Sequence, residues 1–163
     1  MVDLLLDDDV QSVVSGWFPE SAATVITRAV RAAAAQQGFQ RGQIGVRLTG
    51  DATIREINRE FLSHDYATDV ISFGYGHDQD SRFLEGELVA SVETALSQAI
   101  DNEQTPDNEL ILYVVHGTLH IAGLDDQDDA SRAEMRRAEA ESLRRFTELT
   151  ATEVGVGRGG ASR

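Results

Sequence analysis

A long buried helix is predicted by the stretch NELILYVVHGTLHIAGLDD, which spans residues 108–126. Its apolar residues recur at intervals of three and four, the spacing of one helical face. Pro106 precedes the stretch at a position that suits the first turn of a helix. Gly123 suits a helix end, because glycine adopts the left-handed conformation that commonly terminates helices. We therefore expect a helix over residues 108–122 to run through the core.

The rest of the chain alternates between strand and helix patterns. Strand patterns occur at residues 2–6, 43–48, 69–73 and 83–92. Helix patterns occur at residues 22–37, 51–61, 93–102 and 129–149. This order predicts a single α+β domain, in which a small mixed sheet of about four strands packs with about five helices. We expect residues 1–149 to form this domain and the glycine-rich residues 150–163 to be a disordered tail.

The composition is strongly acidic and lacks cysteine. The 163 residues include 28 Asp and Glu against 14 basic residues, which gives a net charge of −14. Such acidity argues against a nucleic-acid partner, because phosphate binding normally needs a basic surface. All the basic residues are arginine, whose planar guanidinium is well shaped for phosphate, but a compositional habit of the genome explains this more simply. Without cysteine, any metal would have to be held by His, Asp or Glu.

Targeting signals and membrane spans are not evident in the sequence. The apolar run at residues 4–6 is too short for a signal peptide, and the acidic run at 7–9 follows it. No apolar run approaches the ~20 residues that a membrane-spanning helix needs. We therefore expect a soluble, cytoplasmic protein that has no membrane partner.

Two histidines four positions apart suggest a metal centre on the long helix, in the C-terminal half of the chain. His116 and His120 are separated by about 400° of helical rotation, so both imidazoles project from one face. Gly123 can then turn the chain back on itself, and Asp126 could supply a third ligand. Three protein ligands would leave one coordination position open to water, as in catalytic metal sites.

Plainer interpretations of these residues stay open. Histidines at this spacing also occur in ordinary helix cores, and acidic residues such as those at 125–129 commonly cap a following helix. The alternating Arg and Glu of residues 134–145 are typical of a solvated helix face. Zinc peptidases of the H-E-x-x-H type carry a general-base Glu after the first histidine, where this chain has Gly117. The pattern thus predicts that residues 1–149 form a metal-dependent hydrolase domain, but not a peptidase of the usual kind.

Three blocks of sequence carry a resemblance to a known family. The blocks are HGTLHIAGLDD at 116–126, INREF at 57–61 with TDVISF at 68–73, and LEGELVAS at 84–91. They resemble the H-G-x-L-H-L-x-G-Y-D-H, L-N-x-x-Y-R … T-D-V-L-S-F and L-G-D-I-V-I-S motifs of the YbeY family, the bacterial rRNA maturation factors. Order and spacing agree over about residues 40–148.

The resemblance implies a zinc-dependent endoribonuclease that cleaves single-stranded RNA. It implies a role in maturation of the 16S rRNA 3′ end and in ribosome quality control, with the ribosome or a ribosomal protein as partner. One zinc ion per chain would be held by His116, His120 and Asp126. Whether a water molecule or the RNA 2′-hydroxyl attacks the phosphodiester stays open, as does the oligomeric state.

Two positions depart from the family pattern. The third ligand of the family is usually His, where this chain has Asp126, and the family carries an Arg where this chain has Leu62. Arg59, one helical turn back, and His64, two residues on, are the candidates to replace that arginine. We predict that Arg59 steadies the developing phosphate charge and that His64 and Asp125 carry protons. The plainer interpretations are a loop histidine and a helix-capping aspartate.

Two other functions fit the same sequence. A zinc metallopeptidase-like hydrolase is favoured by the histidine spacing and disfavoured by Gly117. A non-catalytic ribosome-assembly factor would use zinc only to fasten its C-terminal helices. In either nucleic-acid role, the acidity predicts weak affinity for RNA, so a basic partner or the ribosome is expected to deliver the substrate.

Overall fold

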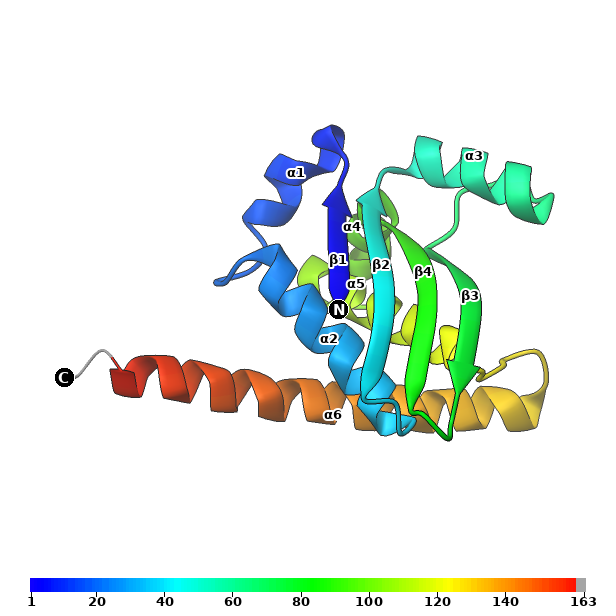
Figure 1. Ribbon diagram of the computed structural model, residues 1–163. Coiled ribbons are helices and arrows are strands. Elements are labelled where there is room, and N and C mark those ends of the chain that lie inside the picture. Colours follow the sequence, from blue (N-terminus) through cyan, green and yellow to red (C-terminus); the bar gives the residue numbers. More distant parts are fainter. Residues whose placement is uncertain (161–163) are drawn as a thin grey trace.

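A computed structural model describes residues 1–160 of the chain, and the side chains of residues 1–155. In chain order the elements are β1 (Val2–Leu6), α1 (Asp8–Ser15), α2 (Ala22–Gln36), β2 (Arg41–Thr49), α3 (Asp51–Leu62), β3 (Val70–Asp78), β4 (Phe83–Ser91), α4 (Val92–Asp101), α5 (Pro106–Ile121) and α6 (Asp129–Gly160). Helices α2, α5 and α6 lie behind one face of the sheet, and none of the helices within residues 1–160 lies across the middle of the other face (Figure 1).

The four strands form one mixed sheet in the order β1-β2-β4-β3. Strands β1, β2 and β4 run parallel, whereas β3 pairs antiparallel with β4 at the edge. The connections between the parallel strands contain helices, α1 and α2 between β1 and β2 and α3 between β2 and β4, as is usual for such connections. The predicted α+β domain with a small four-stranded mixed sheet is therefore confirmed, with six helices in the described residues instead of about five.

Helix α5 is the centre of the core, as the apolar stretch predicted. Leu110, Val114 and Leu119 are fully buried between the sheet and the neighbouring helices. Gly117 lets α5 approach β3, because a Cβ at that position would lie only 3.1 Å from Ser72 Oγ. The Ser72 hydroxyl donates a hydrogen bond of 3.1 Å to the Gly117 carbonyl. This close contact fixes the end of α5 that carries the histidines.

Helix α1 and the end of β3 differ from the prediction. The acidic run after β1 looks like a simple strand flank, but it opens α1, which buries Val10 and Val14 one turn apart. Its acidic first turn is favourable because the helix dipole stabilises carboxylates there. Residues 74–78 look like a loop because of their glycines. They extend β3 instead, since pairing with β4 accommodates a bulge between Gly74 and Gly76.

Helix α6 is longer than the sequence pattern predicts. The pattern ends this helix at residue 149, whereas α6 continues to residue 160. Here Arg28 of α2 forms an ion pair with Glu153 (Nη2–Oε2, 2.5 Å), a contact that no local pattern reveals. Of the disorder predicted for 150–163, residues 150–160 are helical in the structure, and residues 161–163 lie outside the described residues. Neither α6 nor any other helix in the described residues is both long and apolar enough to cross a lipid bilayer.

Candidate metal centre

The two histidines meet on the exposed side of α5, as their spacing predicts. The Nε2 atoms of His116 and His120 lie 3.0 Å apart. Their rings are nearly perpendicular, with centroids 4.5 Å apart and an interplanar angle of 81°. Both side chains are about a quarter exposed, 25% for His116 and 27% for His120. The pair is therefore fixed by the helix yet open to a ligand from solvent.

The turn after α5 brings a carboxylate back to the histidines. Gly123 has a φ of +105°, in the left-handed region that favours glycine. The Leu124 N–H donates to the Leu119 carbonyl (3.1 Å), which closes the helix end and reverses the chain. Asp126 Oδ2 consequently lies 3.5 Å from His116 Nε2 and 3.4 Å from His120 Nε2. The predicted triad comes together, with its three ligand atoms within 4.8 Å of one another.

Each histidine also forms a hydrogen bond through its other ring nitrogen, Nδ1. His116 Nδ1 lies 2.7 Å from Glu139 Oε1 of α6, and His120 Nδ1 lies 2.9 Å from the Leu124 carbonyl oxygen. A carboxylate and a carbonyl can only accept hydrogen bonds at neutral pH, so each Nδ1 carries the proton. This arrangement orients a metal-binding imidazole and fixes its tautomer.

The resulting donor set fits a cation. With both Nδ1 atoms protonated, the Nε2 lone pairs of His116 and His120 face each other and the Asp126 carboxylate. Three electron-rich atoms this close repel one another unless a positive charge lies between them. Two imidazole nitrogens and one carboxylate oxygen are a typical three-ligand set for zinc, with a fourth position left open. The group could therefore hold a metal ion.

A proton would compete with a metal for this position. Burial of the His116 ring opposes its protonation, but the hydrogen bond and charge of Glu139, together with the charge of Asp126, raise the pKa of His116. Metal ligation requires the neutral imidazole, so a raised pKa favours metal release in mild acid.

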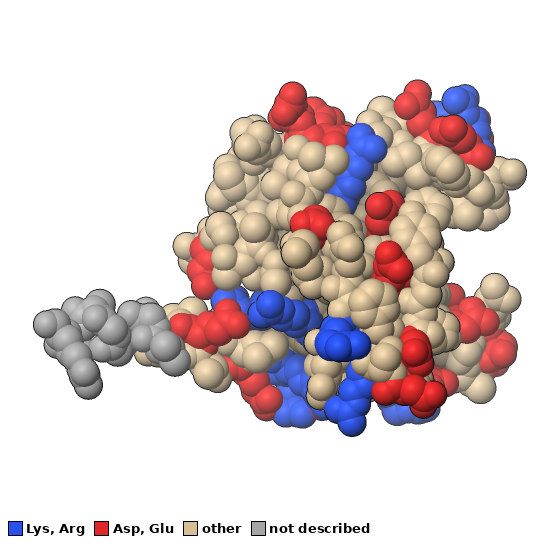
Figure 2. Space-filling view, in the orientation of Figure 1, with Lys and Arg blue, Asp and Glu red and all other residues tan. Residues whose placement is uncertain are grey.

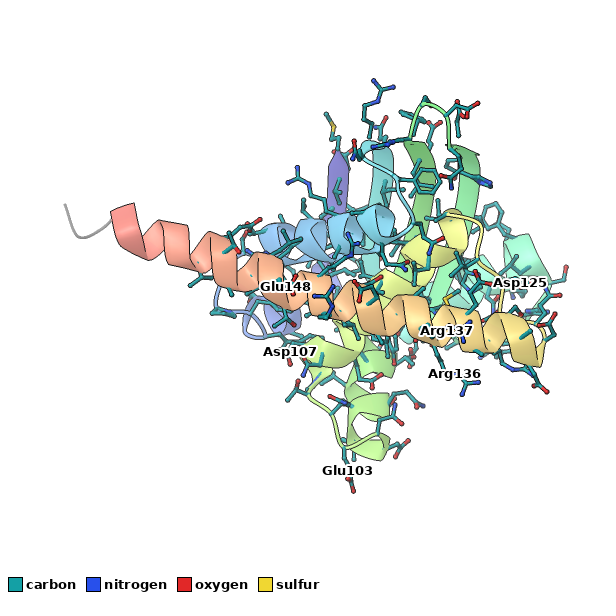
Figure 3. The ribbon with its side chains drawn as sticks, turned by 90° about the horizontal axis from the view of Figure 1, so that it is seen from below. Glu103, Asp107, Asp125, Arg136, Arg137 and Glu148 are labelled. Carbon is teal, nitrogen blue, oxygen red and sulfur yellow. The ribbon has the colours of Figure 1, made fainter. Side chains whose placement is uncertain are left out.

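The three other predicted site residues lie outside this triad. Arg59 is exposed on the last turn of α3, and His64 lies just after that helix, stacked on Tyr66 at a centroid distance of 5.4 Å. Among the described residues, no hydrogen bond or ion pair joins Arg59 or His64 to the triad. Asp125 accepts a hydrogen bond from the Asp126 N–H (2.8 Å), and Figure 3 shows it beside the start of α6. Asp125 thus borders the centre, and the roles of all three residues stay predictions.

Glu139 is the residue that the sequence interpretation missed. Its segment, residues 134–145, looks like a solvated helix face, yet the Glu139 side chain is only 18% exposed and contacts His116. Met135, Ala138 and Ser142 on the same helix are buried. These three residues recur at intervals of three and four, the spacing of one buried helix face. That spacing is the sequence signal that could have placed Glu139 beside the core.

The fold and the triad define a class of protein: a small α+β domain with a candidate three-ligand metal centre at the end of its central helix. The family model described as Endoribonuclease YbeY matches residues 12–147. The chain therefore belongs to the YbeY family, as the three sequence blocks predicted.

Individual relatives agree with this assignment. A Rhodopirellula baltica protein named Endoribonuclease YbeY is 52% identical over 146 residues, covering 87% of this chain and 74% of the relative. A protein of the same name from Azorhizobium caulinodans is 36% identical, covering 87% of this chain and 89% of the relative. The solution structure of TM1509 from Thermotoga maritima matches with a TM-score of 0.61 at 20% identity, covering 94% of this chain and 93% of that one. That last likeness shows a shared fold.

Proposed function

We propose that this chain is a zinc-dependent endoribonuclease of the cytoplasm, acting on single-stranded rRNA in 16S rRNA 3′-end maturation and ribosome quality control. Membership of the YbeY family supports ribonuclease activity, because the matched relatives carry the name endoribonuclease. The observation that carries the metal dependence is the convergence of the His116, His120 and Asp126 ligand atoms within 4.8 Å.

Zinc is the metal that this donor set favours. Imidazole nitrogen suits zinc better than magnesium or calcium, which prefer oxygen ligands. With three protein ligands the fourth position stays available for a reactant. Zinc bound there would act as a Lewis acid toward a phosphoryl oxygen and would lower the pKa of a water molecule.

The protein side chains orient this chemistry. Glu139 keeps the Nδ1 proton of His116 in place, so that the Nε2 lone pair points toward the metal position. The Leu124 carbonyl does the same for His120. Arg59 is proposed to stabilise the developing phosphate charge, and His64 and Asp125 to carry protons. These three roles require the RNA strand to pass from the triad toward α3.

A non-catalytic assembly factor with a structural zinc is the second candidate. It is supported by the way the centre joins α5, the following loop and, through Glu139, α6. A peptidase is disfavoured further by the packing around Gly117. A Cβ there would lie 3.1 Å from Ser72 Oγ and from Val70 Cγ2 of β3, so a general-base Glu would crowd both side chains.

Cleavage assays with and without chelator distinguish the candidates. Purified protein is incubated with labelled single-stranded RNA and with a peptide substrate, and its zinc content is measured by elemental analysis. We expect stoichiometric zinc and chelator-sensitive cleavage of RNA alone. Zinc-loaded protein that leaves the RNA intact would refute the nuclease. Loss of helical circular dichroism on chelation, without any cleavage, would support the structural zinc.

A further inference from the structure

A cavity lined by arginines opens where β1 and β2 begin. Its volume is about 330 Å³, and its lining includes Arg31 of α2 and Arg41 of β2 above apolar side chains such as Phe39 and Leu84. No Asp or Glu is among its lining residues. This is notable in a chain with 28 acidic and 14 basic residues. We call this site the arginine cavity.

Both arginines are free of carboxylate partners within the described residues. Six other arginines there form ion pairs: Arg28, Arg47, Arg55, Arg132, Arg144 and Arg145. Glu153 lines a neighbouring hollow together with Arg31, but the buried Arg28 binds its carboxylate. Arg31, one turn further along α2, is thereby left with its guanidinium donors available to an external anion.

The backbone around Arg41 is well fixed. The N–H groups of Gln40 and Arg41 both donate to the Arg82 carbonyl at 3.0 Å, which ties the start of β2 to the β3–β4 hairpin. Arg82 is itself exposed, and no ion pair involves it among the described side chains. In the space-filling view, blue atoms gather over the lower part of this face, red atoms flank them on both sides, and both colours occur at its top (Figure 2). The positive charge of Arg41 is therefore carried by a segment of backbone that hydrogen bonds hold in place.

We infer that the arginine cavity binds a phosphodiester group of the RNA backbone, which holds the strand at a second place besides the metal centre. Guanidinium groups bind phosphate oxygens through paired, charge-assisted hydrogen bonds. The inference rests on the proposed function for its RNA substrate. It explains how a chain with a net charge of −14 can hold RNA, because the attraction comes from one cavity whose lining contains no carboxylate.

The test compares two double variants that remove the same charge. In one, Arg31→Gln and Arg41→Gln remove both guanidinium groups from the cavity lining. In the control, Arg144→Gln and Arg145→Gln remove two arginines of α6 that carboxylates already bind. Binding of a fluorescent single-stranded RNA is followed by anisotropy at several salt concentrations, in chelator, with circular dichroism to verify folding. Cleavage of the same RNA is measured separately with zinc-loaded protein.

We expect the cavity variant to bind RNA about tenfold or more weakly, whatever the sequence, as for lost phosphate contacts. The slope of log affinity against log salt should fall by about 0.7, the value for one phosphate contact of a single strand. The control variant should match the wild type. Equal affinity and slope in wild type and cavity variant, or equal losses in both variants, would overturn the inference.

The two assays separate this inference from the proposed nuclease. If the cavity variant cleaves and binds RNA as the wild type does, the inference about the arginine cavity is refuted and the proposed nuclease is not. Arginine-dependent binding without any cleavage refutes the nuclease alone, and absence of both refutes both. Competition with adenosine monophosphate tests whether the cavity binds the RNA backbone or the phosphate of a free nucleotide. Displacement of RNA at micromolar nucleotide would overturn backbone binding in favour of a free-nucleotide site.

Discussion

Helix α6 contacts two polar clusters through two glutamates, and the clusters are built on different principles. In its N-terminal half, Glu139 accepts a hydrogen bond from His116 in the candidate metal centre. Further along, Glu153 binds the guanidinium of Arg28, whose side chain is only 2% exposed. Arg28 also forms a two-pronged pair with Glu20, at 2.8 and 3.1 Å. Hydrogen bonding to Glu20, opposed by burial and reinforced by Glu153, raises the pKa of Arg28.

The difference lies in whether hydrogen-bond donors and acceptors are matched within the protein, which is what we call balanced. Arg28 donates to two carboxylates and to the Thr150 hydroxyl, so its hydrogen-bonding groups are satisfied without any ligand. The triad instead gathers acceptors with no donor between their facing lone pairs. Matched donors and acceptors stabilise the fold, whereas the facing acceptors of the unbalanced cluster could hold a metal ion. The following predictions test this comparison.

The largest effect is expected from removing a ligand of the unbalanced cluster. His120→Ala should abolish stoichiometric zinc binding and RNA cleavage, while thermal stability without metal stays close to that of the metal-free wild type. The measurements are elemental analysis after dialysis and thermal unfolding in chelator. His64→Ala, which removes a histidine outside the triad, is the matched control for metal content. Full zinc in the His120 variant would refute the metal centre.

Removing the centre of the balanced cluster should affect stability alone. Arg28→Met leaves Glu20 and Glu153 without their common partner. We expect a loss of about 2 kcal/mol in the free energy of unfolding, less than for a fully buried pair, because Glu153 is 48% exposed. Urea unfolding measures this loss. Zinc content at saturation should not change; a variant that lost zinc while folded would show that the two clusters are coupled.

An intermediate effect is expected from the outer carboxylate of the metal centre. Glu139→Gln keeps a hydrogen-bond acceptor for His116 Nδ1 but removes the negative charge. Zinc affinity should fall by about tenfold, the lower end of the usual cost of losing such a partner. Competition with a fluorescent zinc chelator measures the affinity. Glu141→Gln, which changes a glutamate bound to Arg144 on the same helix, should leave it unchanged. Equal affinities in wild type and Glu139→Gln would show that the negative charge of Glu139 does not contribute to zinc binding.

The same two clusters show how far the sequence could be used. The triad was predictable because its parts are local: His116 and His120 share a helical face, and Gly123 reverses the chain toward Asp126. The helix over 108–122 was predictable for the same reason, since apolar spacing within one segment determines it. Its observed bounds, Pro106–Ile121, differ only at the ends.

Contacts between distant segments were not predictable. Glu139 and Glu153 acquire their roles only when α6 packs on α5 and α2, and a glutamate on a charged helix otherwise looks solvated. The continuation of α6 beyond residue 149 was not predictable for the same reason. Its glycines suggest a tail, and its contact with Arg28 comes from a distant segment. The bulged end of β3 depends in the same way on its partner β4.

The smallest predicted effect concerns the charge of the triad itself. Asp126 contributes a negative charge, so zinc in this centre would carry a net charge of +1 instead of +2. The water that zinc activates should therefore be less acidic than in a centre of three histidines. Replacing Asp126→His should shift the pH–rate profile of RNA cleavage to lower pH, with zinc content verified in both proteins. Coinciding profiles would show that the surroundings offset the charge of the Asp126 carboxylate. The two polar clusters would then differ in ligand geometry and not in the charge of the triad.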